Sequence, residues 1–214
     1  SSNPIPICKA LERKGFVNLV KRSKDQTSDP ISFKSAKKNI SYNKEQLEVI
    51  KSLNNSIKSK KYSSNLLHGV TGSGKTEIFI EIISVVKKMG KCAIVLIPEI
   101  SLTSQIAGRF KEVLGDDMAL WHSQLSKSQR AKTWRDINDG TCKVVIGARS
   151  AIFAPIKNLA LIIVDEEHDS SYKQDSPSPR YHARDVAIMR AKIENCTVVL
   201  SSATPSLETF YNYK

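Results

Sequence analysis

The sequence predicts an α/β domain in which helices flank a mostly parallel β-sheet. Three observations lead to this prediction. From about residue 43 onward, short apolar segments alternate with longer segments of helical periodicity. Two of the short segments, 93–97 and 161–164, are continuously apolar, which is typical of strands covered on both faces. A glycine-rich loop joins the first expected strand to the helix after it.

The expected elements follow one another along the chain. A helix opens the series, because Asn43 and Gln46 have the spacing of a capping box. Its apolar stripe consists of Leu47, Ile50, Leu53 and Ile57. We then expect strands at 64–68, 92–97, 117–121, 142–146, 160–164 and 197–201. Further helices are expected at 75–89, 101–114, 126–138 and 182–194. Trp121 and Trp134 lie in a strand and a helix, so we expect both in the core.

Residues 1–40 have a different character. Residues 5–20 predict a helix and a strand that are too small to fold alone, so they are expected to end a domain that begins upstream. Residues 21–40 are rich in Lys, Ser and Asp, which indicates a linker. The expected plan is therefore 1–20, 21–40 and one domain over 41–214. Because Ser1 replaces an initiator Met, we expect a processed product or a cut piece.

Composition narrows the class of protein. The 214 residues carry a net charge of +12, of which residues 1–61 contribute +9 through fourteen Lys and Arg against five Asp and Glu. This indicates either a polyanionic partner or a Lys-rich solvated surface. Without a long apolar run or a signal peptide, we expect a cytoplasmic protein without a membrane span. The four cysteines are far apart, which predicts reduced thiols and neither zinc nor disulfides.

The glycine-rich loop fits the phosphate-binding pattern G-x-x-x-x-G-K-[ST] at every defined position. Its glycines let the backbone wrap around a phosphate, and the N–H groups of the next helix then face the anion. Lys75 can reach the β- and γ-phosphates, and the Thr76 hydroxyl can bind Mg²⁺. The strand before and the helix after disfavour an accidental match. We assign to an ATP site the residues Gly69, Thr71, Gly72, Ser73, Gly74, Lys75, Thr76 and Glu77.

Three carboxylates and a histidine follow the apolar strand 161–164, namely Asp165, Glu166, Glu167 and His168. In a parallel sheet, ligands bind at the carboxyl ends of strands, and the phosphate loop lies at such an end. We therefore expect Asp165 near Lys75 and Thr76, holding Mg²⁺ directly or through water. Glu166 is then suited to orient or deprotonate the attacking water. Alone, this acidic run would be a solvated turn; the phosphate loop favours the catalytic interpretation.

Small hydroxyl residues follow the strand 197–200. The small hydroxyl residues of 201–205 could hydrogen-bond His168 and Asp165. Alternatively, the segment is a strand-to-helix turn in which Ser206 caps the last helix. Both interpretations can hold at once.

In this order, the motifs strongly resemble superfamily 2 helicases of the DEAH-like type, and among them the primosomal helicases of replication restart. The resemblance is carried by GVTGSGKTE (69–77), PEISLT (98–103), GARSAIFAP (147–155), DEEHDSSYKQ (165–174), RYHARDVA (180–187) and SSATPS (201–206). Ala148 and Ser201 depart mildly from the pattern, where Thr and Gly are expected. The resemblance implies a RecA-like P-loop NTPase domain over 41–214, preceded by the end of a winged helix.

The resemblance also implies roles for single residues. Gln46 would contact the adenine. Asp165 and Glu166 would be the metal-binding and catalytic acids, with Lys75 and His168 completing the catalytic set. His168, Ser202 and Thr204 would couple hydrolysis to movement.

Two segments are implied to touch the DNA strand, 98–103 and 147–150. Thr103, Arg149 and Ser150 can donate to phosphate oxygens, although either segment alone is more often an ordinary strand-to-helix loop. The stretch 170–181 mixes aromatic residues and cations, which stack on bases and pair with phosphates. The resemblance implies that it senses single-stranded DNA through Tyr172, Lys173, Arg180 and Tyr181. The alternative is a surface loop with both tyrosines packed at its base.

The implied function is a replication-restart helicase that couples Mg-ATP hydrolysis to 3′-to-5′ movement on single-stranded and forked DNA. Primosome and single-strand-binding proteins would be its partners. The second motor domain and the zinc-binding cysteines of the family are absent from these residues. We therefore expect a fragment with the first motor domain, nearly inactive alone, because the second domain supplies arginine fingers.

Other functions remain open. Another superfamily 2 DNA translocase would share the same motifs. A phosphate-loop kinase or small-molecule transferase is disfavoured by the pairing of D-E-E-H with S-A-T. A DNA-binding module with a vestigial nucleotide site is disfavoured by the intact Lys75, Thr76, Asp165 and Glu166.

Overall fold

A computed structural model of the chain describes residues 12, 14, 15, 41–98 and 104–213. The chain divides into two compact units, residues 1–36 and 37–214. In the first unit, the amide of Gly15 donates to the carbonyl of Glu12 (2.9 Å). The other residues of the expected winged-helix end and linker lie outside the described residues, so those assignments stay predictions.

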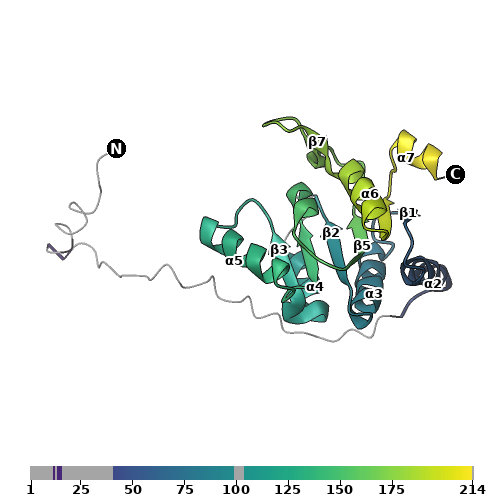
Figure 1. Ribbon diagram of the computed structural model, residues 1–214, viewed down its shortest axis with the longest axis horizontal. Coiled ribbons are helices and arrows are strands. Elements are labelled where there is room, and N and C mark those ends of the chain that lie inside the picture. Colours follow the sequence, from purple (N-terminus) through teal and green to yellow (C-terminus); the bar gives the residue numbers. More distant parts are fainter. Residues whose placement is uncertain (1–11, 13, 16–40, 99–103, 214) are drawn as a thin grey trace. The chain divides into compact units, whose positions relative to one another are not determined.

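Six parallel strands form one sheet in the order β1-β8-β5-β2-β4-β3 (Figure 1). They are β1 (Ser63–His68), β2 (Cys92–Leu96), β3 (Met118–Trp121), β4 (Val144–Gly147), β5 (Leu159–Val164) and β8 (Thr197–Ser202). The helices are α2 (Lys44–Lys58), α3 (Lys75–Lys88), α4 (Ser104–Leu114), α5 (Lys127–Asn138), α6 (Ala183–Ile193) and α7 (Leu207–Asn212). Short 3₁₀ helices are η1 (Gly115–Asp117), η2 (Arg149–Phe153) and η3 (Ser170–Tyr172). The expected parallel sheet is confirmed.

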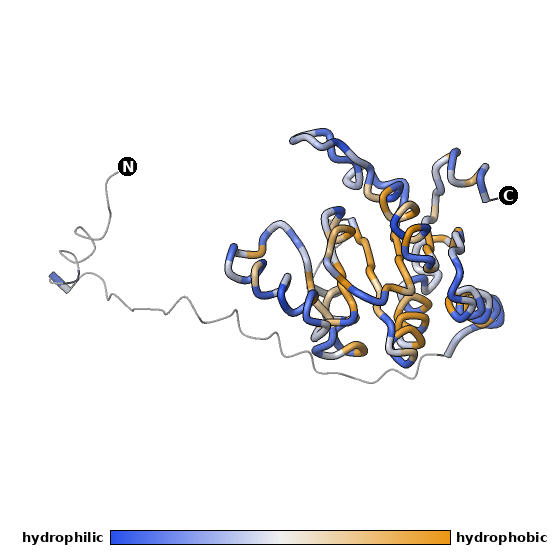
Figure 2. The backbone as a smooth tube through the Cα atoms, viewed as in Figure 1, coloured by the Kyte–Doolittle hydropathy of each residue, from blue (hydrophilic) through white to orange (hydrophobic). Residues whose placement is uncertain are grey.

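Helices cover both faces of the sheet. Along β2, Ile94 and Leu96 belong to a buried cluster that includes residues of α5, η2 and α6, whereas Ala93 and Val95 belong to a second cluster with residues of α2, α3 and α4. Every residue of β2 is buried, because the side chains alternate between two covered faces. This explains why the strand sequence is continuously apolar. Figure 2 shows the hydrophobic residues concentrated along the central strands and the helix faces against them.

The start of α2 follows the sequence closely. The Asn43 side chain accepts from the Gln46 amide (2.8 Å), and the Gln46 side chain accepts from the Asn43 amide (2.9 Å). The expected capping box is confirmed. The apolar stripe is narrower than expected, because Leu47 is exposed while Ile50, Leu53 and Ile57 are buried.

The expected core position of Trp134 is wrong, because this side chain on α5 is 43% exposed. Trp121, at the end of β3, is half-buried against the core. A helix at the edge strand of a sheet has no further layer above it, so a large ring there can remain in contact with solvent.

A short antiparallel hairpin follows the acidic motif. Its strands are β6 (Lys173–Gln174) and β7 (Tyr181–His182). The sequence indicated only an irregular loop here, because two-residue strands leave no periodic pattern. Figure 1 shows the hairpin projecting from the domain beside α6.

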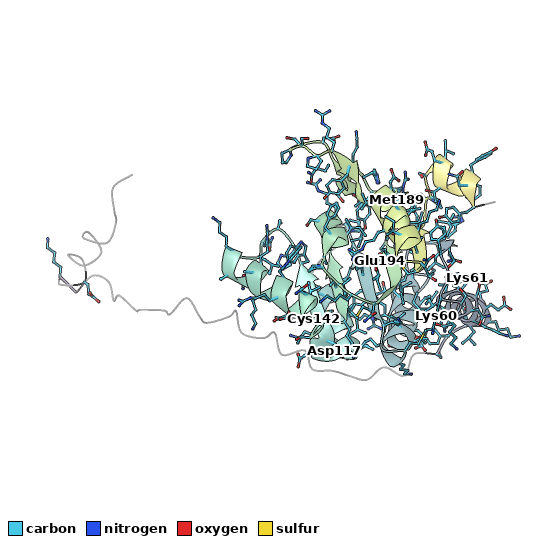
Figure 3. All side chains as sticks on the ribbon, in the orientation of Figure 1. Lys60, Lys61, Asp117, Cys142, Met189 and Glu194 are labelled. Carbon is cyan, nitrogen blue, oxygen red and sulfur yellow. The ribbon has the colours of Figure 1, made fainter. Side chains whose placement is uncertain are left out.

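The described cysteines, Cys92, Cys142 and Cys196, are free and buried (Figure 3 labels Cys142). Burial raises the pKa of all three thiols, that of Cys196 to about 12. They therefore act as small apolar side chains of the core. Among the described residues, none of the helices combines the length and apolarity needed to cross a membrane.

Candidate functional site

The glycine-rich loop lies between β1 and α3, and its shape depends on two glycines in the left-handed region. Gly72 has φ 80°, and Gly74, the N-cap of α3, has φ 84°. Residues with a Cβ are strained there. The Gln46 side-chain amide supports the loop by donating to the Ser73 carbonyl (2.8 Å). A Cβ at Gly74 would lie 2.6 Å from that amide nitrogen, so the loop and α2 are fitted to each other.

Lys75 joins the glycine-rich loop to the acidic strand end. Its ammonium donates to the Gly69 carbonyl (2.8 Å) and lies 3.3 Å from Glu166 Oε1. The residue is 8% exposed, so its charge is held at a defined point between the two segments. The strand order explains the meeting: β1, β8 and β5 are neighbours and run in parallel. The segments after these three strands therefore lie side by side at one edge of the sheet.

Asp165 lies at the end of β5, where its Oδ1 accepts from the Ser201 hydroxyl (3.0 Å). Desolvation and the neighbouring charge of Glu166 raise the pKa of this carboxyl, although Ser201 and Lys75 oppose the shift. Glu166 has φ 46°, in the left-handed region. This turn brings its carboxylate toward Lys75. The loop thus gathers two adjacent carboxylates and one lysine.

His168 connects the acidic loop to the segment after β8. Its Nδ1 lies 2.8 Å from the Ser202 hydroxyl and 3.8 Å from Glu166 Oε2, while Nε2 lies 3.5 Å from Thr204 Oγ1. The Ser202 hydroxyl also accepts from the Thr204 amide (2.9 Å). Both interpretations of this segment are borne out, because Ser201 and Ser202 reach Asp165 and His168 while the Ser206 hydroxyl caps α7.

Glu167 is fully buried and bonded on both carboxylate oxygens. Oε1 accepts from the Ser206 amide (2.8 Å). Oε2 accepts from the Arg184 guanidinium (3.1 Å) and the Thr209 hydroxyl (3.0 Å). This carboxylate therefore ties the acidic loop to α6 and α7. The sequence offered one signal for this contact, Arg184 in the RYHARDVA segment.

The other residues expected in the nucleotide site differ in their exposure and in their hydrogen-bond partners. Thr71 is exposed, Thr76 is half-buried, and the Gly69 amide donates to the Ser202 carbonyl (3.2 Å). Glu77 Oε1 accepts from both Nη2 (2.7 Å) and Nε (2.8 Å) of Arg109 on α4. Its carboxylate is thus engaged with a second helix, a contact that the sequence did not reveal.

The expected DNA contacts fall into two groups. Thr103 lies outside the described residues. Arg149 donates to the carbonyls of Lys173 (3.0 Å) and Ser171 (3.4 Å), which links η2 to the hairpin. Ser150 is exposed and accepts from Trp121 Nε1 (3.2 Å).

The second group lies in and around the hairpin. Tyr172 is fully buried and donates its hydroxyl to the Asp165 carbonyl (2.6 Å). Tyr181 is half-buried, with its ring edge-on to Phe153 at 5.1 Å between centroids. Lys173 and Arg180 are exposed. The placement of Tyr172 accords with the alternative of a tyrosine packed at the loop base.

This fold and site define a class of protein. A glycine loop between a parallel strand and a helix, facing an acidic strand end across one lysine, is the arrangement of a phosphate-loop nucleotide-binding domain. The DEAD/DEAH box helicase family model matches residues 43–212. The chain belongs to this family.

The curated relatives are more specific. The chain is 45% identical over 205 residues to the replication restart protein PriA of Chlamydia pneumoniae, covering 95% of this chain and 27% of the relative. It is 48% identical over 205 residues to PriA of Bacillus subtilis, covering 94% and 25%. The chain thus spans about a quarter of the length of these relatives.

Solved structures support the fold alone. The UvsW helicase of bacteriophage T4 aligns with a TM-score of 0.55 at 15% identity, covering 92% of this chain and 68% of that chain. The DNA-bound restriction-modification enzyme LlaBIII aligns with a TM-score of 0.53 at 15% identity, covering 78% and 13%. The expected RecA-like domain is confirmed by the sheet and these neighbours.

Proposed function

We propose that this chain is the ATP-binding first motor domain of a replication-restart DNA helicase. The whole protein would couple Mg-ATP hydrolysis to 3′-to-5′ translocation and unwinding at stalled forks. Its partners would be single-stranded and forked DNA, primosome proteins and single-strand-binding proteins in the cytoplasm. The relatives named replication restart protein PriA support this proposal.

One observation carries the nucleotide site. The Lys75 ammonium lies within reach of both the glycine loop and Glu166. A triphosphate lying in the loop would therefore bring its terminal phosphate close to Glu166, because Lys75 is the residue that contacts that phosphate. We assign the phosphates to the loop amides and Lys75, and the adenine side to Gln46, which lies against the loop.

The residues present suit a magnesium ion. Asp165 offers a carboxylate whose raised pKa reflects a dry, negatively charged surrounding, which a divalent cation would relieve. Asp165 and the Thr76 hydroxyl are hard oxygen donors of the kind that Mg²⁺ prefers. When bound, the ion would neutralise charge on the β- and γ-phosphates.

Glu166 would act as the general base. Its carboxylate is half-buried beside Lys75, so it can accept a proton from a water aligned with the terminal phosphate. His168 contacts both Glu166 and the Ser202–Thr204 segment. We therefore assign His168, Ser202 and Thr204 to coupling between this step and movements after β8.

The test uses the longer protein that contains this chain. Glu166→Gln removes the base and should lower DNA-stimulated ATP hydrolysis by about 10²- to 10⁴-fold. Lys75→Ala removes a charged contact to phosphate and should weaken ATP binding by about 10- to 100-fold. Steady-state phosphate release and fluorescent ATP-analogue titrations measure the two effects.

The matched control is Glu208→Gln, because Glu208 is an exposed carboxylate on α7. It should leave both quantities unchanged. Normal DNA-dependent hydrolysis in both site variants would exclude our assignment. The 214-residue chain alone should hydrolyse ATP at least about 10³-fold more slowly than the longer protein. Robust DNA-stimulated turnover by the chain alone would contradict the proposed division of the active site.

A further inference from the structure

The two tryptophans of the chain lie together on the surface. Trp121 ends β3 and Trp134 lies on α5, with ring centroids 5.7 Å apart and planes inclined by 52°. Trp134 is 43% exposed. A tryptophan ring is costly to leave in water, so a pair with one exposed ring and one half-buried ring indicates a binding surface.

Positive charge lies beside this pair, at Arg130, and along the rest of α5. The Arg130 guanidinium lies 5.8 Å from the centroid of the Trp121 ring. The exposed cations of α5 are Lys127, Arg130, Lys132 and Arg135, against the single acid Asp136. Flat aromatic faces among exposed cations match a ligand that combines flat rings with negative charge. Single-stranded nucleic acid has both features.

The position of the two tryptophans also favours single-stranded nucleic acid as the ligand. Trp121 Nε1 donates to Ser150 Oγ (3.2 Å), and Ser150 belongs to the segment assigned to the DNA strand. Trp121 lies at the carboxyl end of β3, and the nucleotide site lies at the carboxyl ends of β1 and β5 in the same parallel sheet. Figure 1 shows α5 beside β3 at the sheet edge. A strand passing Ser150 would therefore meet the tryptophans next.

We propose that Trp121, Trp134 and Arg130 form a base-stacking subsite for single-stranded DNA. This inference rests on the proposed function and adds a contact that no helicase motif of the chain contains. Trp134 offers the exposed ring face, Trp121 supports it, and Arg130 pairs with a phosphate. Unpaired bases are required, because bases in a duplex are stacked on one another.

The chain reports on this subsite directly, because both of its tryptophans lie there. Titrating an oligothymidylate into the 214-residue chain at low salt should quench the tryptophan fluorescence to a saturating limit. Trp134→Ala should weaken binding by about 5- to 150-fold, the range measured for loss of one stacked base. Trp134→Phe should retain most of the affinity. The fluorescence anisotropy of labelled DNA measures binding independently of tryptophan.

Two controls separate stacking from charge. An abasic oligomer of equal length keeps the phosphates, so it should bind more weakly and leave the fluorescence unchanged. Ile193→Ala removes another exposed apolar side chain, 75% exposed on α6, and should change nothing.

Each of the following outcomes would overturn the subsite. Anisotropy could show DNA binding without quenching, or the abasic oligomer or a duplex could quench equally, and the proposed function would then survive. The tryptophan signal could instead depend on protein concentration alone, which would assign the pair to contact between copies of the chain. Absence of any DNA binding would remove the subsite and the proposed function together.

Discussion

Two nearby segments of this chain differ in the surroundings of their charged side chains. In the acidic loop, the side chains of residues 165–168 are bonded to groups in other elements, as Glu167 is to Arg184, Ser206 and Thr209. In the hairpin, residues 173–182, Lys173 and Arg180 are exposed, and the ion pair of Lys173 joins it to a near neighbour, Asp175 (3.1 Å).

This difference indicates which kind of ligand contact each segment can make. Charges with buried partners keep fixed positions before any ligand arrives, which suits groups that must meet a phosphate or a water at a defined point. Charges in solvent keep their rotational freedom and can pair with a polyanion. Tyr172 precedes the hairpin in sequence, and its buried hydroxyl is bonded to the Asp165 carbonyl of the acidic loop.

The largest expected effect tests the fixed region. Glu167→Ala leaves the Arg184 guanidinium, whose side chain is 19% exposed, without its main buried partner. We expect a loss of about 3–5 kcal/mol in the free energy of unfolding, measured by urea denaturation. Glu208→Ala, on the exposed face of α7, should cost less than about 1 kcal/mol. A loss in Glu167→Ala as small as that of the control would mean that the buried network does not hold α6 and α7.

A smaller loss of stability is expected where Tyr172 joins the hairpin to the acidic loop. Tyr172→Phe removes the hydroxyl that donates to the Asp165 carbonyl while keeping the buried ring. We expect a loss of about 1–3 kcal/mol, because the carbonyl loses its partner in a buried place. Tyr211→Phe is the matched control, because Tyr211 is 82% exposed, and it should be neutral. Equal unfolding midpoints for the two variants would show that the hydroxyl does not fasten the hairpin to the acidic loop.

The pH dependence tests the environment of Asp165. Its pKa is raised in the fold by desolvation and by Glu166, so the native state holds more protons than the unfolded state between the two pKa values. Stability should therefore fall as pH rises from about 4, the ordinary value for Asp, through the raised value. Asp165→Asn should abolish this part of the decline, as urea midpoints across that range would show.

Ser201→Ala sharpens the same measurement. The Ser201 hydroxyl lowers the pKa of Asp165, so its removal should raise that pKa further. Carboxyl ¹³C NMR titration would detect the change. An unchanged or lowered pKa would contradict the hydrogen bond as a stabiliser of the charged carboxylate.

The smallest effect on stability belongs to the exposed region. Lys173→Ala breaks a surface ion pair whose side chains are 64% and 72% exposed, so unfolding should change by less than about 0.5 kcal/mol. If Lys173 contacts a phosphate, the slope of log affinity against log salt for single-stranded DNA should fall by about 0.7. Lys88→Ala, on α3, should leave the slope unchanged. An unchanged slope in Lys173→Ala would remove this lysine from the DNA contacts.

The sequence by itself determined most of the elements and predicted which residues would form the nucleotide site. Continuous apolar runs specify buried strands, the glycines of 69–74 specify the loop, and Asn43 with Gln46 specifies a helix start. These are local signals, readable within a few residues because backbone geometry and capping act over that range. The catalytic interpretation of Lys75 and Glu166 followed from them and the parallel sheet.

Only the tertiary structure decided which side chains meet across the sheet. The strand order β1-β8-β5 brings Lys75, His168 and Ser202 together, and neither that order nor the partners of Glu167 can be read from spacing. The exposure of Trp134 likewise depends on β3 being the edge strand. Such contacts join residues far apart in sequence, and their geometry is fixed by how the layers pack.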